Sequence, residues 1–369
     1  MTQQVLIVDY ADLQKDQNKD IQAIFEQAFG PNGTGIIAVR NVPNFVKTKS
    51  QCLLKAHTLQ ALPEEYLETE LTDPDSLYNA GWSLGKEKLG NGSPDTAKGS
   101  FYFNPCTDTP GSAEDRAKYP LSYPCNVWPT EDKVPDFENS AKELGMLLKG
   151  VTVDLARHLD AYLQARVTSY QPNTLYHAMK DTEKVKGRLL YYYPHTKIES
   201  DDGNEDDERS ESWIGWHNDS GFLTALAGDF YLDHTTGQLL DNCPDDQAGL
   251  YVADRQDEIH RVVIPSDCMA IQLGECTQIL SGGVVCATPH WVRAAKTPNV
   301  ARISLAAFVD TPPQFQLWTP KGATKEMVCH SDQQSKRVPP LDKRWTENGM
   351  TFGDFLTQTF QMYYNWTQP

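Results

Sequence analysis

The segment His217-Asn-Asp-Ser-Gly-Phe-Leu-Thr-Ala-Leu226 places an imidazole and a carboxylate directly before a short apolar strand. Residues i and i+2 of an extended chain project to the same side, so His217 and Asp219 can reach one metal ion together. Two imidazoles and one carboxylate on one face of a metal are a ligand set that suits non-haem Fe(II) and leaves coordination positions open. The segment therefore predicts a metal site at the start of a strand.

Two other His-x-acid pairs occur in the chain, His158-Leu-Asp160 and His330-Ser-Asp332. With nine His and 50 acidic residues among 369, about one such pair is expected by chance, so context must separate them. The first pair falls in a helical pattern, where residues two apart point about 200° apart and cannot bind one ion. No histidine follows the second pair to complete a site. Only the pair before the strand can converge on a metal.

The third ligand must come from another strand, and three downstream histidines are candidates: His234, His260 and His290. His234 lies in a turn, and His260 precedes an alternating strand in which it can be an ordinary exposed residue. We favour His290, because the pair Arg302-Ile-Ser304 follows it in the chain. His260 is the next candidate.

Arg302 and Ser304 share one face of a predicted strand. A guanidinium fork and a hydroxyl on one face can together hold one carboxylate of a dicarboxylate, while a metal holds the other end. Arg-x-Ser taken alone is most simply an exposed strand pair. Its place after His217-x-Asp219 and His290 favours the binding role.

From Arg188 onward, short apolar and aromatic runs alternate with turn signals, a pattern typical of a β-sandwich or barrel. The expected strands span 189–193, 222–226, 249–252, 259–264, 269–273, 284–287 and 302–309. The fold class that we predict is therefore mainly β with flanking helices.

The flanking elements are predicted from periodicity. Leucines spaced three and four residues apart over 144–163 predict a long amphipathic helix, and 351–366 predicts a final helix. The N-terminal region predicts an αβ unit with strands at 5–8 and 35–39 and a helix at 21–29. Residues 90–133, rich in Gly, Pro and aromatic side chains, predict long irregular structure.

Acidic residues outnumber basic ones by 50 to 33, which gives a formal net charge of −17. Such a charge repels nucleic acid and anionic lipid, so we expect neither as a partner and a small neutral, cationic or zwitterionic substrate. The acidic stretch Glu199 to Glu211 predicts a solvated loop. The chain shows no apolar span of membrane length, no secretory signal and no C-x-x-C pair. We therefore expect a cytoplasmic monomer.

The order of these motifs resembles the isopenicillin N synthase-like family of 2-oxoglutarate and Fe(II)-dependent dioxygenases. The resemblance rests on Arg188-Leu-Leu-Tyr-Tyr-Tyr-Pro194, His217-x-Asp219, His290 and the segment from Arg302 to Pro313. Similar segments upstream are Val5 to Asp9, Gly35 to Pro43 and Asn126-Val-Trp-Pro129. The resemblance implies a double-stranded β-helix (jelly roll) core at 179–320, an N-terminal region at 1–178 that wraps it, and a C-terminal extension at 321–369.

The same resemblance implies roles for individual residues. Fe(II) would be held by His217, Asp219 and His290, and 2-oxoglutarate by Arg302, Ser304 and Tyr193. The substrate pocket would be lined by Tyr191, Phe308, Phe101 and Phe103, although Phe101 and Phe103 are more simply core residues. The chain departs from the family at Tyr191, where many relatives have Asn, and in reading His-Trp-Val rather than His-Arg-Val at the distal ligand.

The function that the resemblance implies is oxidation, by default hydroxylation, of a small organic metabolite with release of succinate and CO₂. Fe(II), 2-oxoglutarate and O₂ would be required, with ascorbate as a supporting reductant. Desaturation, demethylation and ring closure differ from hydroxylation only in how the substrate is positioned. Two alternatives are a 2-oxoglutarate-independent iron oxidase on the same fold and a non-catalytic metal-binding jelly-roll module.

Overall fold

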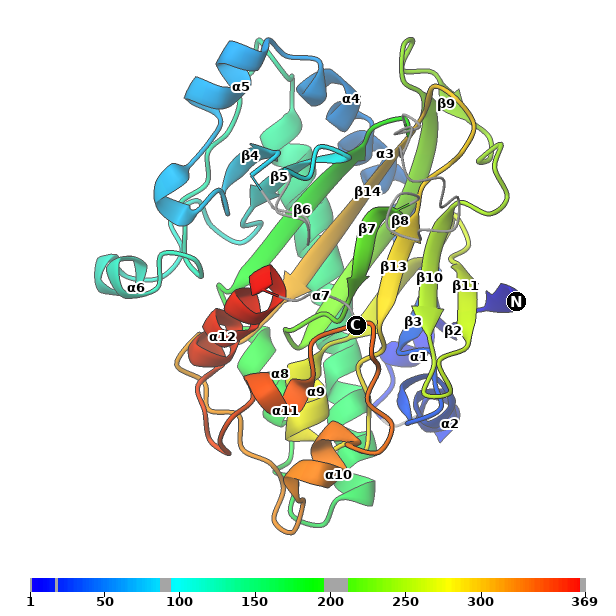
Figure 1. Cartoon of the computed structure of the whole chain (residues 1–369), viewed down its shortest axis with the longest axis vertical. Helices are drawn as coiled ribbons and strands as arrows, with labels where there is room; N and C mark the ends of the chain where they lie inside the picture. The colour runs from blue at the N-terminus through cyan, green and yellow to red at the C-terminus, as the bar shows by residue number, and fades with distance from the viewer. Residues whose placement is uncertain (1, 17–18, 87–93, 196–211, 366–369) are drawn as a thin grey trace.

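Two β-sheets face each other as a sandwich, with helices packed around it (Figure 1). The computed structural model describes residues 2–16, 19–86, 94–195 and 212–365. The acidic stretch Glu199 to Glu211 lies outside these residues. The predicted fold class, mainly β with flanking helices around a jelly-roll core, is confirmed.

The larger sheet collects strands from the whole chain, with β14 between β8 and β6. Its N-terminal strands β2 and β3 pair in parallel, and β3 joins the rest by pairing with β12. In spatial order the strands are β2 (Leu6–Asp9), β3 (Ile36–Arg40), β12 (Met269–Leu273), β8 (Leu223–Asp233), β14 (Val300–Val309), β6 (Val185–Tyr192), β5 (Lys98–Phe103) and β4 (Gly81–Leu84), with β9 (Leu239–Leu240) paired to β8.

The smaller sheet carries two of the expected metal ligands. Its order is β1 (Thr2–Gln4), β11 (Ile259–Val263), β10 (Gly249–Ala253), β13 (His290–Arg293) and β7 (Ser212–His217). Side chains from both sheets meet in one buried apolar cluster, which includes Leu190 and Tyr192 of the larger sheet and Trp213, Leu250 and Val292 of the smaller. The interior of the sandwich is therefore a shared, water-poor layer.

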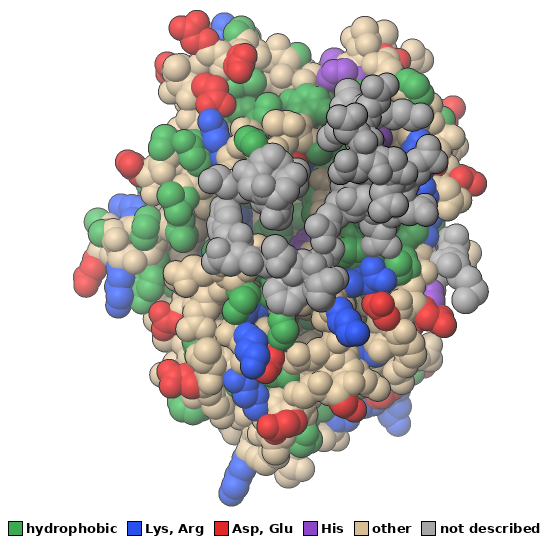
Figure 2. Space-filling model, in the orientation of Figure 1, with side chains coloured by type: hydrophobic (Ala, Val, Ile, Leu, Met, Phe, Trp, Pro, Cys, Tyr) green, Lys and Arg blue, Asp and Glu red, His purple; other side chains and the backbone are tan. Residues whose placement is uncertain are grey.

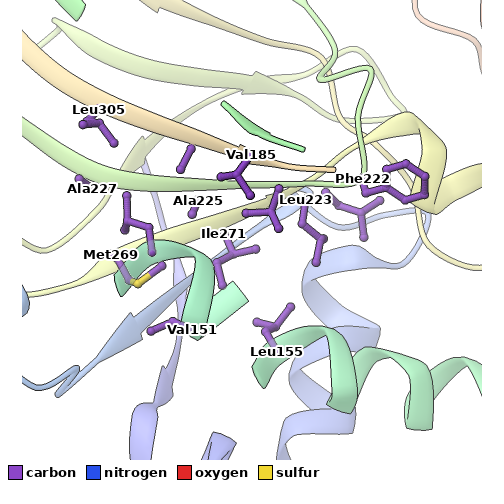
Figure 3. Packing of buried hydrophobic residues seen from close by; sticks show 14 of the residues in the cluster. Val151, Leu155, Val185, Phe222, Leu223, Ala225, Ala227, Met269, Ile271 and Leu305 are labelled. Carbon is purple, nitrogen blue, oxygen red and sulfur yellow. The ribbon is translucent and has the colours of Figure 1, made fainter. Parts of the chain in front are cut away.

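The outer face of the larger sheet is covered by α7 (Phe137–Arg166), the predicted long helix. Figure 3 shows Val151 and Leu155 of this helix directed at Leu223 and Ile271 of the sheet. All four side chains are buried, and each contributes about 1.5–3 kcal/mol through the area it removes from water. The helix therefore backs the sheet that carries Arg302.

The remaining helices are shorter and lie around the two sheets. They are α1 (Tyr10–Leu13), α2 (Lys19–Phe29), α3 (Phe45–Leu53), α4 (Lys55–Gln60), α5 (Glu64–Glu70), α6 (Ala113–Lys118), α8 (Thr174–Lys180), α9 (Glu275–Leu280), α10 (Lys325–Cys329), α11 (Leu341–Arg344) and α12 (Phe352–Asn365), together with the 3₁₀ turn Pro74–Ser76. Helices were expected at 21–29 and 351–366, and α2 and α12 confirm both.

Two expectations about local structure are wrong. Residues 90–133 are not irregular throughout, because β5 lies within them and extends the larger sheet beside β6. Residues 284–287 do not form a strand, and the ladder beside β7 and β10 is made instead by β13. In both places the pairing partner is far away in sequence, so a local pattern could not identify the strand.

A bulge in β8 changes which side chains face the interior. Against β14, Ser304 lies opposite Asp229 but Ala306 lies opposite Leu226, so β8 has one extra residue between these pairs. Gly228, inside the bulge, has a φ of +76°, a conformation that residues with a Cβ rarely adopt. Leu226 and Tyr231 consequently both face the interior cluster, although they are five residues apart.

The surface does not concentrate one sign of charge on the face shown in Figure 2. Lys and Arg side chains lie among Asp and Glu side chains there. Within the described part of the chain, no helix has the length and apolar character needed to cross a membrane.

We predict that Gly228→Ala lowers the free energy of unfolding by about 1–2 kcal/mol, because a Cβ is strained at positive φ. The added atom would also lie 3.0 Å from Lys49 Nζ. Gly150→Ala is the matched control, since a Cβ there meets nothing within 4 Å on α7, and we expect a gain of about 0.5–1 kcal/mol. Chemical denaturation of both variants measures the difference, and equal effects would contradict the assignment of the bulge.

Candidate metal centre and cosubstrate pocket

The three residues expected to bind metal lie together at one end of the sandwich. β7 and β13 are antiparallel neighbours, and His217 lies directly opposite His290 with ring centroids 4.1 Å apart. Asp219 follows β7, and its Oδ1 is 3.9 Å from His290 Nε2. One ligand atom from each residue lies within 4.8 Å of the other two. The three side chains lie together as the sequence predicts, and His290 is the histidine that lies beside His217 and Asp219.

His260 does not join this group. It belongs to a second cluster with Asp254 and Glu258, and its Nε2 lies 2.8 Å from Asp254 Oδ2. The pair His158 and Asp160 is buried on α7 without a shared ligand position: His158 Nε2 lies 3.0 Å from the Leu13 carbonyl, whereas Asp160 accepts a hydrogen bond from Tyr170. Both residues are structural.

Burial determines the protonation of the three ligands. It lowers the pKa of His217 to about 3, with His290 as a second cause, and the pKa of His290 to about 4. Both imidazoles are therefore neutral at pH 7 and have a lone pair for a metal. Burial also raises the pKa of Asp219, and its Oδ2 has no hydrogen-bond partner among the described residues. A bound cation would compensate this buried carboxylate, so the donor set fits a divalent metal.

Neighbouring groups orient both imidazoles. His217 Nδ1 lies 2.9 Å from the Gly215 carbonyl, and His290 Nδ1 lies 3.2 Å from the Thr288 carbonyl and 2.6 Å from the Gln272 side-chain amide. A proton on His217 Nδ1 can be donated to the Gly215 carbonyl, which leaves Nε2 as the metal ligand. A proton on His290 Nδ1 can be donated to the Thr288 carbonyl in the same way when the Gln272 amide presents its oxygen to Nδ1, because the amide nitrogen is itself a donor. The sequence reasoning missed Gln272. Its only signal was a polar residue within the apolar strand Met269–Leu273.

Arg302 is buried in the interior of the same sandwich. Its Nε donates to Asp229 Oδ2 at 2.9 Å, and its guanidinium lies 4.8 Å from the centre of the Tyr192 ring. Burial alone would raise the pKa of the Asp229 carboxyl, but the neighbouring Arg302 guanidinium holds this pKa below its usual range. Nη1 of Arg302 is buried and has no hydrogen-bond partner among the described residues. Ser304, also buried, lies on the same face of β14.

Tyr193 is not beside Arg302 as expected. In the β14–β6 ladder Arg302 lies opposite Tyr192, so Tyr192 faces the interior and Tyr193 faces the other way. The Tyr193 ring packs against Tyr191 with centroids 5.2 Å apart, and the Tyr191 hydroxyl lies 2.7 Å from His234 Nδ1. The side chains of β6 alternate between the two faces as expected. The residue on the same face as Arg302 is, however, Tyr192 and not its neighbour Tyr193.

Three of the four expected pocket residues also lie on the outer face. Tyr191, Phe101 and Phe103 belong to the core between the larger sheet and α7. Phe101 and Phe103 pack against Trp128 with ring centroids 5.6 and 5.5 Å apart. Their assignment to a substrate pocket is wrong, and their simpler interpretation as core residues holds. Phe308 alternates with buried residues of the outer core and lies on the same face of β14 as Arg302.

The inner face of β5 and β6 carries polar groups that the sequence reasoning missed. Arg188 Nε donates to Ser100 Oγ at 3.0 Å, and its guanidinium lies 5.0 Å from the centre of the Tyr102 ring. Lys186 Nζ donates to Asn79 Oδ1 at 2.7 Å. The charge of Arg188 also contributes to the lowered pKa of His217, after burial and the neighbouring histidine. The wall therefore lies on the same side of the sandwich interior as the candidate ligand His217.

The sandwich with this arrangement of ligands has the fold of solved 2-oxoglutarate and iron oxygenases. A full-length protein of Neurospora crassa, solved in complex with alpha-KG, aligns with a TM-score of 0.65 and 18% identity, over 96% of this chain and 95% of that chain. JOX2 in complex with 2OG, Fe and JA aligns with a TM-score of 0.60 and 18% identity, over 100% and 87%.

A third structure with the same fold is that of dioxygenase for auxin oxidation 1 from Arabidopsis thaliana in a 2-oxoglutarate complex. It aligns with a TM-score of 0.56 and 18% identity, over 87% of this chain and 98% of that chain. No protein-family model and no curated protein matches the chain. At this identity the likeness establishes a common fold, and the residues of the site must carry any functional argument.

We predict that Asp219→Asn abolishes most metal-dependent stabilisation. At about 100 times its Kd, Mn(II) should stabilise the unmodified protein by about 2.7 kcal/mol and the variant by less than about 1 kcal/mol. Without metal the variant should be at least as stable, because it removes a carboxylate whose ionisation burial opposes. Asp254→Asn, in the second acidic cluster, is the control. If Asp254→Asn rather than Asp219→Asn removes the stabilisation, the metal binds elsewhere.

Proposed function

We propose that this protein is a 2-oxoglutarate and Fe(II)-dependent dioxygenase that oxidises a small organic molecule. The proposal rests on one observation. The three candidate metal ligands lie inside the same sandwich as the buried Arg302 guanidinium, whose Nη1 has no hydrogen-bond partner among the described residues. The first group can hold a metal with open positions, and the second can hold an anion. A ligand such as 2-oxoglutarate, which chelates a metal at one end and carries a carboxylate at the other, needs both a metal with open positions and an anion-binding group.

His217, Asp219 and His290 would hold the Fe(II) ion, which supplies the O₂ chemistry of the reaction when bound. The protein's part is to keep both imidazoles neutral and to keep Asp219 in a place where water cannot compensate its charge. The Gly215 and Thr288 carbonyls lie where they would accept the Nδ1 protons, which would leave the Nε2 atoms available.

Arg302 and Ser304 would bind the distal carboxylate of 2-oxoglutarate. A carboxylate that enters the interior loses its hydration, and a charge-assisted fork and a hydroxyl can replace it. Asp229 fixes the Nε side of the guanidinium, and Nη1 is a donor that remains for a ligand. In the proposed reaction the C1–C2 bond of 2-oxoglutarate breaks to give succinate and CO₂. One oxygen atom of O₂ enters succinate, and in hydroxylation the other enters the substrate.

One observation favours the alternative of an iron oxidase that does not use 2-oxoglutarate. Arg302 already has an internal carboxylate partner in Asp229, so its charge is partly neutralised before any ligand binds. An arginine paired in this way can be structural. The affinity for 2-oxoglutarate decides between the two functions.

We expect Arg302→Ala to weaken 2-oxoglutarate binding by roughly 30-fold or more, because breaking one side of a buried charge pair costs on the order of 2–5 kcal/mol. Arg302→Lys keeps the charge opposite Asp229 and should recover part of this loss. Ser304→Ala should lose about 1 kcal/mol, the value of one hydrogen bond. Titration of 2-oxoglutarate into the anaerobic Fe(II) protein, followed by the metal-to-ligand charge-transfer band, measures all three. Absence of the band in the unmodified protein would favour the iron oxidase.

We further propose that the substrate carries a carboxylate. Arg188 and Lys186 lie on the interior face of β6, which also carries Tyr192 beside Arg302. Local charges act more strongly than distant ones in a water-poor site, so this wall outweighs the net charge of −17. A neutral or cationic substrate, which the net charge favours, is not what these side chains would select, whereas a zwitterion remains compatible.

We predict that Arg188→Gln raises the apparent KM for a small carboxylic acid substrate by about tenfold or more, because one charge-assisted hydrogen bond is lost. Succinate release with small carboxylic acids and with their amides compares the charged and neutral forms directly. Arg166→Gln, on the exposed end of α7, is the control and should change nothing. Preference for the amides by the unmodified protein would exclude a carboxylate substrate, while substrate-independent 2-oxoglutarate turnover would still report the proposed activity.

A further inference from the structure

The link between two of the expected metal ligands is held from outside the sandwich. Asn218 lies between His217 and Asp219, beyond the end of β7. Its backbone N–H donates to the Tyr363 hydroxyl at 3.1 Å, and its side-chain amide donates to Glu275 Oε1 at 2.9 Å. The N–H of Glu275 in turn donates to the Asp219 carbonyl at 2.8 Å. Three hydrogen bonds to residues of α9 and α12 thus fix Asn218 and Asp219, which follow the last residue of β7 and make no strand pairing.

Glu275 is itself fixed by the C-terminal extension. Both its carboxylate oxygens accept from the guanidinium of Arg344, at the end of α11, and neither side chain is exposed by more than 1%. Arg344 also donates to the Pro339 carbonyl. The guanidinium lies 5.7 Å from the centre of the Tyr363 ring, so the two contacts to the link form one packed unit. A buried two-point ion pair with its other donors satisfied holds one geometry firmly.

We infer that residues 341–363 and Glu275 of α9 together act as a clasp that positions Asp219 for metal binding, with Tyr363, Glu275 and Arg344 as its positioning residues. Asp219 is buried, and its Oδ2 has no hydrogen-bond partner among the described residues. A carboxylate in that position would turn toward water if its backbone were free to move. The clasp prevents this and so lowers the ordering cost of metal binding.

The clasp rests on the proposed function in one respect, namely that His217, Asp219 and His290 bind the metal. It does not depend on 2-oxoglutarate, on the substrate or on catalysis, so it is tested with metal alone. In this proposal the helices α11 and α12, which are remote in sequence from β7, influence the affinity of the site for metal although they contribute no ligand to it.

The experiment titrates Co(II) into the full-length, metal-free protein and its Tyr363→Phe variant, with calorimetry and the Co(II) absorption spectrum as readouts. The variant loses only the hydroxyl that accepts from Asn218. We expect its Kd for Co(II) to rise by about 3- to 10-fold, the effect of one hydrogen bond, and its Co(II) bands to shift. Glu275→Gln, which keeps the shape but removes the charge opposite Arg344, should have a larger effect.

Tyr170→Phe is the matched control. It removes the hydroxyl of another buried tyrosine, which donates to Asp160 in a contact between α7 and the loop that follows it. We expect it to lower the unfolding temperature without changing the Kd for Co(II) or the Co(II) spectrum. Unchanged Co(II) affinity and spectrum in Tyr363→Phe, with tight binding by the unmodified protein, would overturn the clasp alone. Absence of Co(II) binding by the unmodified protein would overturn the proposed metal site as well.

Discussion

Side-chain alternation along the strands is the constraint on which the site depends, because only one face of each strand meets the interior of the sandwich. The pairing of Arg302 with Tyr192 sets that face for both β14 and β6, and it thereby brings Arg188 inward with them. A shift of one residue would direct the guanidinium toward α7. The bulge at Gly228 adjusts the alternation once, so that β8 presents Asp229 to Arg302.

Buried charge is the second theme, and Asp219 differs from three carboxylates that have buried cationic partners. Asp229 pairs with Arg302, Glu275 with Arg344, and Asp310 lies 3.8 Å from Lys184. Asp219 has two imidazoles as its neighbours in the ligand cluster, and burial keeps both of them neutral. A bound cation is the simplest compensation for a carboxylate in such a place.

Net charge and local charge lead to different expectations about the substrate. The value of −17 describes the field far from the protein, where solvent screens it. The inner wall near the candidate metal ligands carries Arg188 and Lys186, which lie on one face of the same strand. Composition is the basis for expecting no nucleic-acid or lipid partner, but it could not describe a wall made by two residues.

Features that depend on local spacing could be predicted from the amino-acid order. Alternation placed Arg302 with Ser304, and leucine periodicity predicted α7. The His-x-Asp spacing indicated that His217 and Asp219 lie close together, although His217 ends β7 and Asp219 lies in the loop that follows, not at the start of the strand expected at 222–226. Local spacing could not determine which face of β6 is interior, so Tyr193 and Tyr191 were assigned to the wrong side. Nor could it connect Glu275, Arg344 and Tyr363 with Asn218, which lies between the candidate ligands His217 and Asp219. Strand pairing and helix docking decided these features, because they are set by partners distant in sequence whose contacts exist only in the folded chain.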